Sequence, residues 1–69
     1  MVEIFKTDVR KRTKAKNILL ILQKEFPHLK INFDLWDCDK ILRVKGKTIS
    51  IERIISLVEE QKYSCELLQ

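Results

Sequence analysis

The stretch KINFDLWDCDKILRVK, residues 30–45, decides the fold because it has the pattern of a β-hairpin. Apolar and polar side chains alternate at 31–36, which is typical of a strand with one buried face. Residues 37–40 form a short polar turn, and a second alternating run follows at 41–45. The stretch therefore predicts two adjacent antiparallel strands.

A four-residue turn also predicts which side chains of the two strands lie opposite each other. The expected pairs are Trp36 with Ile41, Leu35 with Leu42, Asp34 with Arg43 and Phe33 with Val44. The pairs of Leu35 with Leu42 and of Phe33 with Val44 would face the core, and the acid and the base would meet on the outer face. Such a cross-strand pair helps to hold two strands in one register.

Further strands are expected at residues 2–7 and 63–68, and helices at 13–26 and 51–61. In both helical segments, apolar residues recur at the spacing of one buried helix face. Pro27 ends the first helix because proline cannot continue it.

The order strand-helix-strand-strand-helix-strand predicts an α+β fold with right-handed crossovers. We expect a ferredoxin-like sandwich, in which a four-stranded antiparallel sheet carries both helices on one face. Residues 1–69 would form a single domain. In this topology, residues 8–14, Cys38 and Tyr63 lie on one rim of the sheet.

The composition favours a soluble, cytoplasmic protein without a membrane partner. The longest apolar run, residues 18–22, is far shorter than the roughly 20 residues that span a bilayer. No apolar segment typical of a signal peptide stands at the N-terminus. Two cysteines are too few for a disulfide scaffold, and we expect free thiols.

The positive charge is concentrated in one segment. The chain has a net charge of +4, yet residues 6–16 hold six basic side chains and one acidic, which is +5. The candidate binding residues are Arg10, Lys11, Arg12 and Lys14, at the start of the first helix. A helix N-terminus offers unpaired N–H groups and a partial positive charge, so an anion or an acidic partner would bind there. The alternative is a solvated basic loop that only aids solubility.

Nearly the whole chain resembles the heavy-metal-associated, copper-chaperone-like domains. FKTDVRKRTK (5–14) is similar to the first strand and metal loop of that family, and INFDLWDCDKILRV (31–44) to its central hairpin. ISIERIISLVEEQKYSCELL (49–68) resembles its second helix and the step into the last strand. The resemblance implies the same ferredoxin-like fold.

The departures from the family pattern concern the metal site. Lys11 and Lys14 stand at the positions of the two metal-binding cysteines, and Lys62 replaces the glycine before the aromatic Tyr63. Soft cations are held by thiolates, whereas an ammonium group has no lone pair and repels a cation. The usual metal site is therefore absent, and we expect no cofactor there.

A metal carrier that uses other residues remains an alternative. Cys38 and Cys65 would supply two thiolates for copper or zinc, and Asp37, Asp39 and His28 are further ligands by residue type. In the expected strand order, however, the two thiols belong to opposite edges of the sheet.

Nucleic acid binding and catalysis have weaker support. Basic residues suit a phosphate backbone, and Phe5 and Trp36 would have to stack bases on the open face of the sheet. The chain has one histidine and no motif that pairs carboxylates or activates a nucleophile. We therefore expect a non-catalytic module that binds an acidic protein or another anion.

Overall fold

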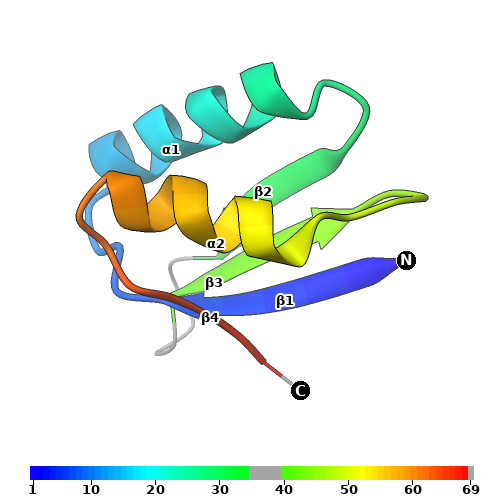
Figure 1. Ribbon diagram of the computed structural model, residues 1–69. Helices are drawn as coiled ribbons and strands as arrows, with labels where there is room; N and C mark the ends of the chain where they lie inside the picture. Colours follow the sequence, from blue (N-terminus) through cyan, green and yellow to red (C-terminus); the bar gives the residue numbers. More distant parts are fainter. Residues whose placement is uncertain (35–39, 69) are drawn as a thin grey trace.

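The computed structural model describes residues 1–34 and 40–68 (Figure 1). Its elements are β1 (Val2–Thr7), α1 (Arg12–Glu25), β2 (Lys30–Asp34), β3 (Ile41–Lys45), α2 (Ile51–Glu60) and β4 (Cys65–Leu67). The four strands form one sheet in the order β2-β3-β1-β4, and all neighbours are antiparallel. The predicted ferredoxin-like α+β arrangement is confirmed.

Both helices lie on the same side of the sheet, and the core lies between these two layers (Figure 1). Phe5 of β1, Leu42 of β3 and Ile54 of α2 are all fully buried there. α1 turns Ala15, Ile18 and Leu22 toward the core, as its apolar spacing predicts. No helix in the described part of the chain is long and apolar enough to cross a bilayer.

The predicted register of the hairpin is wrong by two residues. Phe33 lies opposite Leu42, and β2 ends at Asp34, which lies opposite Ile41. A slip of two residues leaves every side chain on its expected face, so apolar alternation alone cannot detect it. Asp34 still meets Arg43, diagonally, in an ion pair of 3.9 Å between Oδ2 and Nη2. The expected pairs of Leu35 and Trp36 lie outside the described residues.

Other boundaries differ slightly from the prediction. β4 covers Cys65–Leu67 only, which is shorter than the expected 63–68. Val9, in the expected polar connection after β1, is fully buried. Its side chain anchors this connection in the core. The backbone position of the basic residues that follow is therefore restricted.

Lys62 has a backbone conformation that favours glycine. Its φ of 72° lies in the left-handed region, and its N–H donates to the Glu59 carbonyl at 2.9 Å. This is the position after a helix C-cap that glycine commonly fills, because a Cβ is strained there.

We expect Lys62→Gly to raise the free energy of unfolding by about 0.5–1 kcal/mol, because the left-handed strain is relieved. Urea denaturation measures the change. Lys62→Ala is the matched control, since it removes the charge and keeps the Cβ. An equal gain in both variants would assign the effect to charge and contradict a strained backbone.

Candidate anion or acidic-partner site

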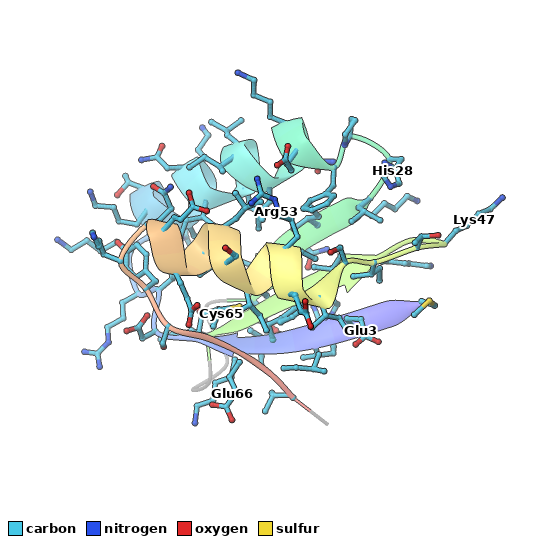
Figure 2. The ribbon with its side chains drawn as sticks, in the orientation of Figure 1. Glu3, His28, Lys47, Arg53, Cys65 and Glu66 are labelled. Carbon is cyan, nitrogen blue, oxygen red and sulfur yellow. The ribbon has the colours of Figure 1, made fainter. Side chains whose placement is uncertain are left out.

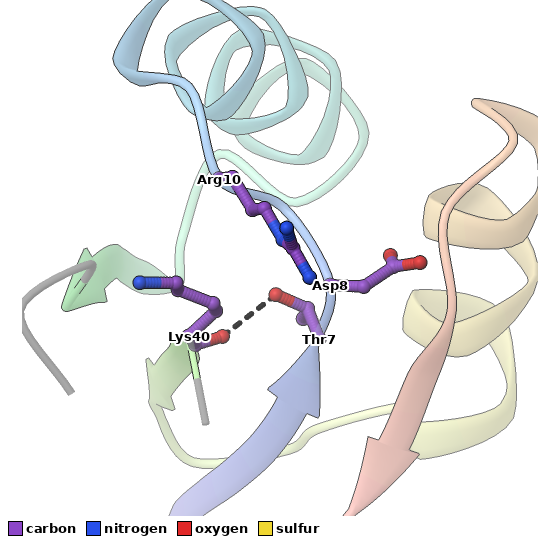
Figure 3. A pocket seen from close by; sticks show the side chains of 4 residues that line it. All are labelled: Thr7, Asp8, Arg10 and Lys40. Atoms are coloured by element: carbon purple, nitrogen blue, oxygen red, sulfur yellow. Dashed lines mark hydrogen bonds between the residues drawn. The ribbon is translucent and has the colours of Figure 1, made fainter. Parts of the chain in front are cut away.

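The loop after β1 is tied to the start of β3 by the Thr7 side chain. Thr7 is only 5% exposed, and its Oγ1 donates to the Lys40 carbonyl at 2.6 Å (Figure 3). The same oxygen accepts the Val9 N–H at 3.3 Å. One buried hydroxyl therefore fixes where the chain leaves the sheet toward α1.

Asp8 ties this loop to the connection between α2 and β4. Its Oδ1 accepts the Ser64 N–H at 2.8 Å. The loop after β1 and the segment that leads into β4 thus meet on one rim, as predicted. Cys38, which was expected on the same rim, lies outside the described residues.

The N-terminus of α1 gathers positive charge. Lys11 is its N-cap and makes no side-chain capping hydrogen bond, and the first turn contains no acidic residue. In α2, by contrast, Glu52 stands in the first turn. Cations at the positive end of a helix are unfavourable on their own, so this arrangement suits a bound negative charge.

A hollow of about 310 Å³ opens beside this helix end, lined by Thr7, Asp8, Arg10 and Lys40 (Figure 3). The Arg10 side chain folds back over Thr7, whereas the Asp8 carboxylate turns away toward the segment between α2 and β4 (Figure 3). A guanidinium presents a planar fork of donors that matches a carboxylate or a phosphate. The Arg10 guanidinium at this hollow is therefore suited to bind an oxyanion.

The structure brings the predicted residues together in two groups. Arg10 lines the hollow, and Lys11, Arg12 and Lys14 are exposed along the first turn of α1. Sequence reasoning missed Lys40, which joins Arg10 from the other side of the hollow. Lys40 could have been found from the sequence, because it directly precedes a strand that starts at the same rim.

Comparison with protein-family models, with curated proteins and with solved structures finds no match. The functional interpretation therefore rests on the residues of this chain.

The thiol of Cys65 is a poor metal ligand. The residue is 7% exposed, and burial raises the pKa of its thiol to about 12, with a smaller contribution from the negative charge of Glu59. A metal ligand must be the thiolate, which this environment disfavours at neutral pH. No group of three His, Cys, Asp or Glu side chains that could hold a metal occurs within 1–34 and 40–68.

Of the other suggested ligands, only His28 lies among the described residues, and it does not join Cys65. His28 lies in the connection between α1 and β2, well separated from Cys65 (Figure 2). Asp37, Cys38 and Asp39 lie outside the described residues.

The raised pKa of Cys65 predicts a loss of stability in alkaline solution. Between about pH 9 and pH 12 the unfolded thiol is ionised and the folded thiol is not, so the unfolded state binds fewer protons. The free energy of unfolding should fall as the pH rises through this window. Urea denaturation at several pH values measures the fall, and Cys65→Ala should show a shallower one because the buried thiol is absent. Identical slopes in both chains would contradict a protonated buried thiol.

Phe5 does not contribute to the aromatic platform that nucleic acid binding would need. Phe5 is fully buried on the face that the helices cover, so it cannot stack on a base. Ile4, its neighbour, takes the other face of β1. Trp36 lies outside the described residues. Alternation alone does not identify the buried side of this strand, and nucleic acid binding would have required Phe5 on the open face.

Proposed function

We propose that this chain is a non-catalytic cytoplasmic binding module of heavy-metal-associated-like fold without the usual metal site. It binds an acidic protein partner or another anion through the loop after β1 and the N-terminus of α1. The observation that carries the proposal is the concentration of Arg10, Lys11, Arg12 and Lys14 at the positive end of a helix whose first turn holds no acid.

The chemistry of these groups supports binding over catalysis. Guanidinium and ammonium groups keep their protons at neutral pH, so they attract negative charge and do not shuttle protons. Arg10 provides this charge beside a hollow that Lys40 also lines and whose backbone is held by Thr7. A carboxylate side chain or a phosphate group would meet donors that are already in place.

Metal binding through Cys38 and Cys65 is the alternative that we do not favour. Cys65 would have to leave its buried position or ionise there, and burial opposes ionisation of its thiol by raising its pKa to about 12. Lysines at positions 11 and 14 would not replace the missing sulfur ligands.

Calorimetric titration with a glutamate-rich peptide tests the proposal, with a lysine-rich peptide of equal length as the matched control. We expect only the acidic peptide to bind, and to bind more weakly as salt is added, because exposed charges are screened. A parallel titration with inorganic phosphate shows whether a single anion is sufficient. Equal heats from both peptides, or no heat from either, would overturn the proposal.

A further inference from the structure

A second basic hollow lies at the other end of the domain. It has a volume of about 370 Å³ and is lined by His28, Lys30, Lys45, Gly46 and Lys47. His28 and Lys47 extend from the end of the molecule opposite to the N-terminus of α1 (Figure 2). The lining comes from the connection before β2, from the paired ends of β2 and β3, and from the turn that follows β3.

Two of the lysines are forced together by the sheet. Lys30 lies directly opposite Lys45 in the β2–β3 register. Side chains in this relation have Cβ atoms about 5 Å apart, and like charges there are destabilising. Lys47 adds a third ammonium group to the same hollow. The sheet thus carries a repulsion that a bound anion would relieve.

No counter-charge within the described residues relieves this repulsion. No acidic side chain lines the hollow among residues 1–34 and 40–68, and none of its three lysines forms an ion pair there. Other basic residues do pair, as Arg43 with Asp34 and Arg53 with Glu25. The lysines of this hollow are therefore available to a ligand.

The backbone around the hollow is held in place by packing. Leu29 is buried, and its carbonyl accepts the Gln23 side-chain N–H at 2.8 Å. A Cβ on Gly46 would collide with the Leu29 side chain, so the two segments that line the hollow approach each other closely. A wall fixed in this way reduces the ordering cost of binding.

We propose that this hollow is a binding site for a small phosphorylated molecule. Lys30, Lys45 and Lys47 neutralise the phosphate, and the His28 ring and the lysine methylene groups contact the organic part. The volume lies at the small end of the range for ligand pockets, which suits a small molecule. This site is separate from the acidic-partner site at the N-terminus of α1.

Amide chemical shifts recorded during titration with phenyl phosphate test this proposal, and inorganic phosphate and sodium chloride are run at matched ionic strength. We expect the amide shifts of residues 28–30 and 45–47 to change and to saturate. The affinity from these changes should be highest for phenyl phosphate. Equal affinity for inorganic phosphate would still support the anion site and assign its ligand to free phosphate. Shifts that sodium chloride reproduces, or no shift at millimolar phenyl phosphate, would overturn it.

Lys45→Glu should change binding and stability in opposite directions. The variant should bind phenyl phosphate at least roughly ten-fold more weakly, and it should unfold at higher urea because an attractive pair with Lys30 replaces a repulsive one. Lys24→Glu, on the last turn of α1, makes the same charge change away from the hollow and should bind normally. Equal loss of affinity in both variants would assign binding to net charge and overturn the site. Arg10→Glu changes only the acidic-partner site, so this variant should still bind phenyl phosphate. The two proposed sites can therefore be tested independently.

Discussion

Lys11→Asp should stabilise the chain and weaken its binding to an acidic peptide. Lys11 is the N-cap of α1 and has the extended backbone that a capping aspartate needs, with φ −94° and ψ 136°. An aspartate there would accept a free helix N–H and would suit the positive helix end. We expect the free energy of unfolding to rise by about 1–2 kcal/mol. The affinity for a glutamate-rich peptide should fall by about ten-fold.

Lys24→Asp provides the matched control at the other end of the same helix. Lys24 is the basic residue of the last turn, where a positive charge is favourable. The control should lose about 0.3–1 kcal/mol of stability and keep its affinity for the acidic peptide. Urea denaturation and calorimetric titration measure both quantities. Equal weakening of binding in the two variants would assign the interaction to net charge and contradict a local site at residue 11.

Phe5→Ala should leave most of the chain unfolded. Phe5 is fully buried in β1, which lies between β3 and β4, and it lies opposite Leu42 and Leu67. Truncating a buried phenylalanine costs about 3–5 kcal/mol, which is a large part of the stability of so small a domain. Circular dichroism and urea denaturation measure the loss.

Ile4→Ala controls for the loss of a large apolar residue from the same strand. Ile4 is only partly buried and lies on the face without helices. We expect this variant to remain folded with a loss of about 1 kcal/mol. A loss equal to that of Phe5→Ala would contradict the assignment of the core to the helix-covered face.

The fold follows from patterns that belong to single segments. Alternation at 30–45 and the apolar stripe of α1 each identify an element without knowledge of its neighbours. The order of these elements then restricts the sheet to few topologies. These features explain why the architecture was predictable, although the register of the hairpin was not.

The unpredicted features depend on contacts between distant segments. A two-residue slip keeps the apolar faces of β2 and β3 unchanged, so no sequence pattern distinguishes Leu42 from Val44 as the partner of Phe33. The bond from Thr7 to the Lys40 carbonyl and that from Ser64 to Asp8 likewise join residues far apart in the chain. The basic segment can be identified from the sequence. The hollow beside it cannot, because its lining residues come together only in the folded chain.

The most direct measurement is an amide-shift map of one isotope-labelled sample, titrated separately with the glutamate-rich peptide and with zinc. We predict salt-sensitive shifts at residues 9–16 with the peptide and no stoichiometric shift at Cys65 with zinc. Stoichiometric zinc shifts at Cys65 that disappear in Cys65→Ser, together with no peptide-dependent shift at 9–16, would contradict a binding module that works through the N-terminus of α1.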